Sequence, residues 1–137
     1  QQEVLPVNLS EYFENAKGKG VLSTADSHGK LTAAVYARPH VMDDGSVAFI
    51  MADRLTHRNL ESNPHAVYLF MEDGEKYRGK RLYLTKVKEE KNSPLIDTLR
   101  RRERCPVDEE YLKQNRYLVH FQIDRTLPLI GEGDRET

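Results

Sequence analysis

A short segment in the middle of the chain carries side chains suited to binding an anion. We predict a helix over Thr56–Ser62, because Thr56 is a suitable N-cap and Pro64 follows the last turn. The first amides of a helix lack partners and carry the positive end of its dipole. A phosphate group there would accept hydrogen bonds from these amides and the Thr56 hydroxyl, with charged bonds from Arg54 and Arg58. The alternative is a solvent-exposed helix with ordinary arginines.

Two further groups of donors border predicted strands. One strand ends at Arg38-Pro39-His40, where Pro39 removes a donor from the sheet and marks an edge or an exit. The Arg38 guanidinium and the His40 imidazole could face a ligand, although a polar loop explains them as well. The segment Tyr77–Arg81 opens a later strand with several donors. Either an anion site or a charged surface hairpin accounts for it.

The histidine and cysteine residues do not form a metal-binding pattern. No two histidines have the spacing typical of zinc ligands, so we expect no metal. The single cysteine, Cys105, forms no intrachain disulfide. Arg102 and Arg104 lie near it and would favour its thiolate, but no partner base is evident, and we interpret it as an incidental or buried thiol. The histidines are His28, His40, His57, His65 and His120.

The overall charge and hydropathy exclude several classes of partner. The net charge of -1 gives no general attraction to nucleic acid or to an anionic membrane. The basic run Arg100–Arg104 has no interleaved aromatic residues, so we interpret it as a solvent-exposed helix face rather than an RNA-binding surface. No apolar stretch approaches the roughly 20 residues of a membrane span, and the first residues lack a signal-peptide pattern. We expect a cytoplasmic protein that binds neither nucleic acid nor membrane.

The first half of the chain predicts one helix and three strands. Apolar residues at helical spacing indicate a helix over Leu9–Ala16, capped by Asn8 or Ser10. The strands are expected at Gly20–Ala25, Leu31–Arg38 and Ser46–Ala52. A turn between the first two places Gly29 where a positive φ is needed, and a second turn is expected at Asp43–Gly45. Short connections between successive strands predict a three-stranded antiparallel meander.

The second half adds three strands and two helices. The segment Ala66–Met71 is nearly all apolar, so we expect a strand buried on both faces. The other predicted elements are a strand at Arg81–Lys88, a helix opened by Ser93-Pro94, a helix at Asp108–Gln114, a strand at Tyr117–Ile123 and an extended tail at Leu127–Ile130. Six antiparallel strands with short flanking helices indicate a mainly β chain closed into a small barrel. Such a barrel is filled by side chains, so a sizeable ligand must lie outside it or between two copies.

We expect a single domain over residues 1–137, in which residues 1–8 and 131–137 are peripheral tails. The order of motifs in this domain resembles the pyridoxamine 5'-phosphate oxidase-like family, the FMN-binding split barrels. The resemblance rests on Leu22–Asp26 leading to Gly29, on the strand Ala33–Ala37, and on Asp44-Gly45 before Val47–Ala52. It is sharpest at Arg58–Pro64, where the family often has a polar residue and Leu followed by Asn-Pro.

The resemblance implies a six-stranded antiparallel split β-barrel that forms a homodimer with FMN at the interface. It places the flavin phosphate near the end of the third strand and the helix that follows. It places the isoalloxazine ring along the backbone of the second strand, with Arg81 approaching from the partner chain. The cofactor-binding residues implied are Val35, Tyr36, Ala37, Arg38, Met51, Arg54, Thr56, Arg58, Asn59 and Arg81.

Departures from the family pattern narrow the expected activity. Family members often have Ser and then Arg or Lys just before the helix, whereas this chain has Arg54, Leu55 and Thr56. Ala34 occupies a position where the oxidase has Arg, and the chain has no Trp, so the C-terminal Trp and Arg segment of the true oxidase is missing. We therefore expect an FMN-dependent oxidoreductase of unknown substrate that accepts electrons from a nicotinamide or another small molecule. The alternatives are a flavin carrier or redox sensor without turnover, a haem-binding member with His40 or His120 as axial ligand, and a ligand-free structural dimer.

Overall fold

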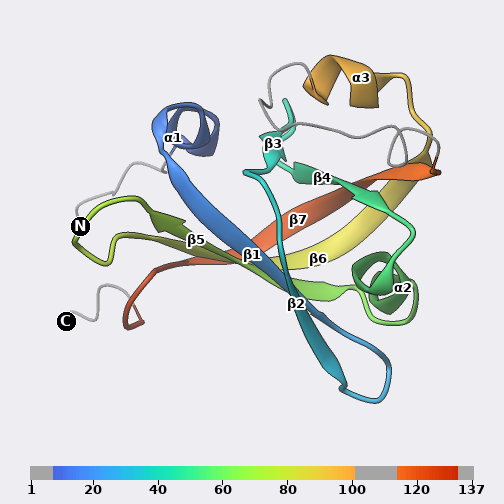
Figure 1. Ribbon diagram of the computed structural model, residues 1–137, viewed down its shortest axis with the longest axis horizontal. Helices are drawn as coiled ribbons and strands as arrows, with labels where there is room; N and C mark the ends of the chain where they lie inside the picture. Colours follow the sequence, from blue (N-terminus) through green and yellow to red (C-terminus); the bar gives the residue numbers. More distant parts are fainter. Residues whose placement is uncertain (1–7, 101–113, 133–137) are drawn as a thin grey trace.

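The computed structural model describes residues 8–100 and 114–132, which form a single curled antiparallel sheet with three short helices (Figure 1). The strands are β1 (Gly18–Ala25), β2 (Leu31–Val35), β3 (His40–Val41), β4 (Val47–Ala52), β5 (His65–Glu72), β6 (Gly79–Lys91) and β7 (Arg116–Pro128). The helices are α1 (Leu9–Asn15), α2 (Leu55–Ser62) and α3 (Leu95–Arg100). Cys105 and nearly all of the helix predicted at Asp108–Gln114 lie outside the described residues.

The sheet confirms the mainly β class but differs from the predicted strands in number and order. Seven strands are present in the described residues instead of six, in the order β2-β1-β5-β6-β7-β4-β3. The predicted three-stranded meander is wrong, because β4 pairs with β3 and β7 and does not pair with β2. The physical reason lies between β2 and β3. The chain leaves the ladder after Val35, and Pro39, which has no N–H, separates the two strands.

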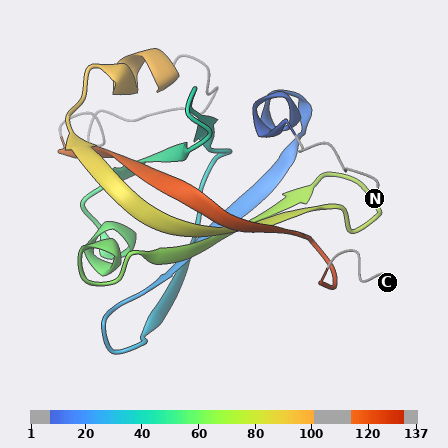
Figure 2. The same ribbon diagram turned by 180° about the vertical axis from the view of Figure 1, so that it is seen from behind.

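A compact apolar core fills the inside of the curled sheet. The largest completely buried side chains include Tyr68, Phe49, Phe70 and Phe121, whose rings make edge-on and tilted contacts. Helix α1 adds Phe13, whose ring meets the Phe70 ring edge-on with the centroids 5.4 Å apart. Helices α1 and α2 lie at opposite ends of β1 in both views (Figures 1 and 2). The interior therefore leaves no room for a large ligand, as expected from the size of the barrel.

A second, smaller core covers part of the outside of the sheet. Ile96 and Leu99 of α3 pack with Ala48 of β4 and Leu118 of β7. Figure 1 shows α3 beside β3 and β4, away from α2. The predicted opening of α3 is confirmed, since the Ser93 hydroxyl accepts a hydrogen bond from the Leu95 amide at 3.2 Å.

The predicted turns and the first cap are also confirmed. Gly29 and Gly45 have φ of 84° and 90°, a backbone conformation that glycine adopts without steric cost. The Asn8 side chain caps α1 by accepting from the Glu11 amide at 3.1 Å. The turn at Gly29 brings β1 and β2 together as a hairpin, with Val21 opposite Val35.

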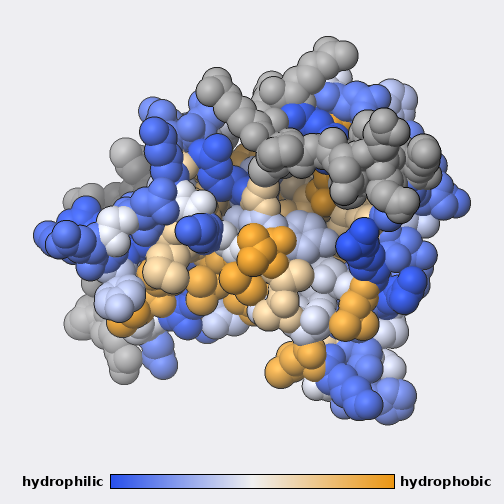
Figure 3. Space-filling view, in the orientation of Figure 1, coloured by the Kyte–Doolittle hydropathy of each residue, from blue (hydrophilic) through white to orange (hydrophobic). Residues whose placement is uncertain are grey.

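The outer face of the β2-β1-β5 part of the sheet is apolar and incompletely covered. Strand β5 alternates, so the prediction that it is buried on both faces is wrong for the single chain. Its outward residues Val67 and Leu69 are half-buried, and Met71 is 40% exposed. Leu69 pairs with Val21 on β1, and Val21 pairs in turn with Val35 on β2. Val35 is 79% exposed. We call Val21, Val35, Val67, Leu69 and Met71 the outer apolar face, and Figure 3 shows apolar side chains gathered over these strands.

None of the helices in the described ranges is long and apolar enough to cross a membrane.

Candidate functional site

The start of α2 offers backbone donors without partners. The helix begins at Leu55 with Arg54 as the N-cap residue, so the prediction that Thr56 caps it is wrong. Arg54 takes the extended conformation typical of a cap, and no side chain caps the helix. The amides of Leu55, Thr56 and His57 therefore have no hydrogen-bond partner among the described residues. The positive end of the dipole of this eight-residue helix is therefore directed at the space in front of Leu55.

Two side chains at this helix start are also without partners. Thr56 is 5% exposed, yet its hydroxyl makes no hydrogen bond within the described part of the chain. The Arg54 guanidinium forms no hydrogen bond or ion pair there either. Arg58 differs, because it donates to the Asp53 carbonyl at 3.3 Å and lies 3.8 Å from the Asp53 carboxylate. Of the two arginines predicted to hold a phosphate, Arg54 is the one that is unpaired.

Asn59, also predicted as a cofactor-binding residue, is occupied by a structural bond. Its side-chain amide donates to the Thr24 hydroxyl on β1 at 3.1 Å, and both residues are buried. One turn later, Asn63 donates to the Asp26 carbonyl at 3.4 Å. These bonds fix α2 against the β1–β2 hairpin, so Asn59 positions the helix start and does not present its side chain to solvent.

The segment predicted to lie along a flavin ring is the end of β2. The Tyr36 amide donates to the Gly20 carbonyl at 3.0 Å, and the Tyr36 carbonyl accepts from the Tyr68 hydroxyl at 3.1 Å. Beyond Tyr36, the amides of Ala37 and Arg38 have no partner in the described residues. Helix α2 contacts β2, whereas this exposed backbone lies toward α1, to which the Arg38 guanidinium bonds.

Three other predicted site residues have side chains committed elsewhere. The Arg38 guanidinium donates to the carbonyls of Phe13 and Ala16 at 2.7 and 2.5 Å, which satisfies the end of α1. Met51 is 1% exposed and packs in the barrel core, so its side chain reaches no surface. Arg81 donates to the Pro128 carbonyl at 2.9 Å and to the Gly131 carbonyl.

The other proposed donor cluster lies away from α2. The segment Tyr77–Arg81 spans the end of the β5–β6 connection and the start of β6, at the end of the barrel opposite α2 in both views (Figures 1 and 2). Arg54 and Arg81 of one chain are therefore not brought together. A site that uses both must take one from each of two copies.

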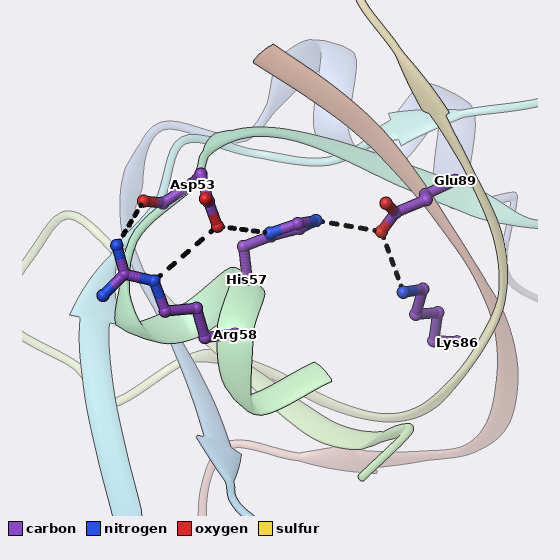
Figure 4. Close-up of polar contacts among 5 residues, drawn as sticks. All are labelled: Asp53, His57, Arg58, Lys86 and Glu89. Atoms are coloured by element: carbon purple, nitrogen blue, oxygen red, sulfur yellow. Dashed lines mark hydrogen bonds and ion pairs between the residues drawn. The ribbon is translucent and has the colours of Figure 1, made fainter. Parts of the chain in front are cut away.

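A buried ion cluster beside the start of α2 was missed by the sequence reasoning. The His57 side chain is 1% exposed, and each of its ring nitrogens lies near a carboxylate (Figure 4). Nδ1 is 2.9 Å from Asp53 and Nε2 is 3.0 Å from Glu89, which also binds Lys86 at 2.8 Å. The ring stacks on Tyr117, with centroids 3.9 Å apart. The four-residue spacing of Asp53 and His57 was visible in the sequence, but Glu89 comes from a distant strand.

The two carboxylates of the cluster are stabilised in their charged forms. The hydrogen bond with His57 is the main cause that holds the pKa of Asp53 below its ordinary value, with a smaller contribution from Arg58. Burial raises the pKa of Glu89, but the bond from Lys86 and the charges of His57 and Lys86 outweigh it and leave that pKa lowered. Both groups are therefore anions at neutral pH.

The histidines considered as haem ligands occupy another part of the sheet. His120 of β7 is buried, and its Nε2 lies 2.9 Å from a carboxylate oxygen of Glu90. His40 lies on the short strand β3. Ala48 of β4 lies between the two histidines in the sheet, because it pairs with His40 on one side and with His120 on the other. In the described ranges, no group of three or more His, Cys, Asp or Glu residues could hold a metal ion.

Comparison with known proteins supports the fold class. No protein-family model matches the sequence, and no curated protein matches it. Among solved structures, an FMN-binding protein from Syntrophomonas wolfei is similar over 89% of this chain and 84% of its own, with 17% identity and a TM-score of 0.71. An F420 reductase is similar over 89% and 98%, with 15% identity and a TM-score of 0.66.

The heme storage protein HutZ from Vibrio cholerae is also similar, over 85% of this chain and 89% of its own, with 18% identity and a TM-score of 0.68. At these identities the comparisons establish the fold and leave the ligand open. The chain therefore has the split-barrel fold, and the resemblance to pyridoxamine 5'-phosphate oxidase-like proteins is confirmed at the level of the fold.

Proposed function

We propose that this protein binds FMN as a homodimer and works as an oxidoreductase. The observation that carries the proposal is the set of unused donors at the start of α2. Three backbone amides, the Thr56 hydroxyl and the Arg54 guanidinium have no partner in the described residues. A phosphate monoester is a dianion with several acceptor oxygens, and it matches such a set.

The nearby negative charge of Asp53 does not exclude a phosphate. Its carboxylate is bound by His57 and lies near Arg58, so its charge is balanced on two sides. Arg54 and Thr56 are the side chains that would hold the phosphate, while Asn59 fixes the helix that presents them. The backbone donors and Thr56 are held in place by the packing of α2 before any ligand arrives, which reduces the entropy lost on binding.

The end of β2 is suited to one edge of a flavin ring. The amides of Ala37 and Arg38 are free to donate, and Val35 presents an exposed apolar surface beside them. Flavin carbonyl oxygens accept hydrogen bonds, and the ring needs an apolar face to stack on. The residues Val35–Arg38 would therefore act mainly through the backbone, because the Arg38 side chain is used at α1.

The outer apolar face supports the homodimer. Strand β5 has the nearly all-apolar sequence of a strand covered on both sides, yet Val67, Leu69 and Met71 are only partly covered in one chain. A second copy packed on this face would bury them. It would also bring the partner chain close to the end of β2, which is where Arg81 of the partner is proposed to approach the ring.

Bound FMN would supply the redox chemistry, by accepting and passing on electrons. The chain would hold and orient the cofactor, and its donors would favour negative charge on the ring edge that they face. No described acid or base is needed for hydride transfer from a reduced nicotinamide, which we propose as a donor. The proposal includes a reducing, cytoplasmic setting, which a chain with a single cysteine favours.

Absorption spectra and two matched ligands test the proposal. We expect the purified protein to bind FMN with flavin absorption bands, and to bind riboflavin, which lacks the phosphate, at least tenfold more weakly. The double substitution of Arg54 and Thr56 by Ala should weaken FMN binding and leave riboflavin binding unchanged. Bleaching of the bound flavin by a reduced nicotinamide in the absence of oxygen would support turnover. A protein that binds no FMN at any concentration tested would overturn the proposal.

The haem-binding alternative predicts a different absorption spectrum. A Soret band after addition of haem, with no flavin binding, would favour it. Both candidates have interactions within the chain, including the contact of His120 Nε2 with Glu90, so His40 and His120 are each replaced in that case. The substitution, His40→Ala or His120→Ala, that abolishes the Soret band would then identify the ligand.

A further inference from the structure

Arg38 links helix α1 to the backbone that we propose for the flavin ring. Its Nη1 donates to the carbonyls of Phe13 and Ala16 at 2.7 and 2.5 Å. These carbonyls lie at the end of α1, where helical carbonyls lack partners and carry the negative end of the dipole. A cation that bonds two of them satisfies both requirements. The Arg38 side chain therefore caps α1, while its own amide is one of the two free donors after β2.

The chain is fixed just before these donors, at Tyr36. The Tyr36 amide donates to a carbonyl of β1 at 3.0 Å, and the Tyr36 carbonyl accepts from the Tyr68 hydroxyl at 3.1 Å. The Tyr36 ring meets the Phe49 ring edge-on, with the centroids 5.9 Å apart. Both backbone groups and the side chain of Tyr36 are therefore attached to the barrel.

After Tyr36 the attachment changes from backbone to side chain. Ala37 is exposed, and Pro39 is buried and has no N–H. Within residues 8–100 and 114–132, the backbone of residues 37–39 makes no hydrogen bond. The bonds from Arg38 to α1 are what hold this stretch, and Pro39 restricts Arg38 to extended conformations. Two free amides thus lie on a short exposed backbone that is fixed at both ends, and Figure 1 shows this connection rising from β2 toward β3 beside α1.

We propose that Arg38 is a positioning residue, which through its bonds to α1 sets the amides of Ala37 and Arg38 for the edge of a flavin ring. This inference rests on the proposed flavin site. Donors fixed before binding reduce the entropy that is lost when the ligand arrives. Such donors stabilise the ring most when it carries negative charge, which it gains on reduction. The link to α1 therefore raises the affinity for the reduced flavin more than the affinity for the oxidised flavin.

Replacement of Arg38 by Met keeps an unbranched side chain and removes the donors. FMN and riboflavin should both bind about tenfold more weakly, because the ring edge is common to the two ligands. The affinity for inorganic phosphate should not change, since its donors are at the start of α2. We expect reduced FMN to lose about tenfold more affinity than oxidised FMN, which lowers the two-electron reduction potential of the bound flavin by about 30 mV.

Three variants separate this role from a loss of charge or of general stability. Arg38→Lys keeps the charge and a donor, so its flavin affinity should lie between those of the wild type and Arg38→Met. Lys30→Gln removes a positive charge from the exposed β1–β2 turn. Asn8→Ala removes the cap at the other end of α1 and lowers the unfolding temperature. Neither of the last two should change flavin affinity or reduction potential.

The experiment combines calorimetry with FMN, riboflavin and inorganic phosphate, equilibration of the bound flavin with a dye of known potential, and thermal unfolding of each variant. In the protein without ligand, the NMR order parameter of the Ala37 amide should fall in Arg38→Met and stay high in Asn8→Ala. If Arg38→Met does not fold, Arg38→Lys is the test, because it should still bind both flavins more weakly than the wild type.

The outcomes distinguish this inference from the proposed function. Flavin affinity and reduction potential that are unchanged in the Arg38 variants would overturn the inference and leave the proposed function intact. The inference also fails if Asn8→Ala lowers both quantities as much as Arg38→Met does. A wild-type protein that binds neither FMN nor riboflavin would overturn both.

Discussion

The Tyr68 hydroxyl donates a hydrogen bond to the Tyr36 carbonyl oxygen over 3.1 Å. Tyr68 is completely buried on β5, while Tyr36 lies where β2 leaves the sheet. The bond therefore ties the exposed end of β2 to the barrel core. It holds in place the short backbone segment that we propose for one edge of the flavin.

Replacement of Tyr68 by Phe should lower the stability of the protein and loosen this segment. Loss of one buried hydrogen bond costs about 1 kcal/mol of the free energy of unfolding. FMN affinity should also fall, because the amides that follow Tyr36 would be less well fixed. Urea unfolding and FMN titration measure the two effects. Tyr83→Phe is the matched control, since the Tyr83 hydroxyl has no hydrogen bond in the described residues and its loss should change neither quantity.

Gly20→Ala should be strongly destabilising, because there is no space for a side chain. A Cβ atom at this position would overlap the ring and hydroxyl of Tyr68, which is fully buried. Overpacking of this kind costs about 1–3 kcal/mol and often more where the neighbour cannot move. Thermal unfolding is the measurement, with Ser23→Ala on the outer face of the same strand as control. An unfolding temperature equal to that of the wild type would show that Tyr68 can move aside.

Arg54→Ala should weaken FMN binding more than Arg58→Ala does. Arg54 has no partner in the described part of the chain, whereas Arg58 already contacts Asp53. We expect about a tenfold loss of affinity for Arg54→Ala, equal to about 1.4 kcal/mol. The dependence of affinity on salt should also become weaker in this variant. The assignment of the phosphate to Arg54 is wrong if Arg58→Ala has the larger effect in the same titrations.

Val67→Lys should disrupt the proposed homodimer without unfolding the chain. Val67 lies in the outer apolar face, where a lysine can reach solvent in the single chain but would be buried at the interface. Light scattering should give the mass of one chain for this variant and of two chains for the wild type. Val87→Lys is the control, since Val87 is an exposed apolar residue of β6 outside this face. A wild-type protein that is already monomeric at high concentration contradicts the proposal.

Acid should destabilise the β1–β2 hairpin through Asp26. Hydrogen bonds from the amides of Lys30 and His28 lower the pKa of this carboxyl below its ordinary value of 3.8. Its contribution is therefore complete above pH 3.8 and is lost as pH falls through the lower, folded value. Asp26→Asn should make the stability fall less steeply with pH below about 4. Urea midpoints over this range test the expectation, and Asp73→Asn, which removes a carboxylate without a hydrogen bond, is the control.

The features predicted correctly from the sequence are those determined by near neighbours. The cap by Asn8, the turns at Gly29 and Gly45, and the opening of α3 at Ser93 each involve residues a few positions apart. The residue types there have strong local preferences, which a single sequence displays. The mainly β class followed from the same local signals.

The features that the sequence did not predict depend on distant partners. The pairing of β4 with β7, the bond from Arg38 to α1 and the contact of His57 with Glu89 all join segments far apart in the chain. The sequence therefore could not show which of the two arginines predicted to hold a phosphate, Arg54 or Arg58, already has a partner. Only the fold shows that Arg54 has no partner among residues 8–100 and 114–132.

The place of β7 between β6 and β4 has a consequence for how the protein is made. Strand β7 is synthesised after every other strand in the described residues, yet it is the only long strand there that pairs with β4. The nascent chain therefore exposes the apolar edge and faces of β4 until β7 has been synthesised. Long-range pairing of this kind is slow to form, and exposed strands invite aggregation. We therefore expect β4 to gain its final pairing only after β7 has been synthesised, although β1, β2, β5 and β6 can pair before then.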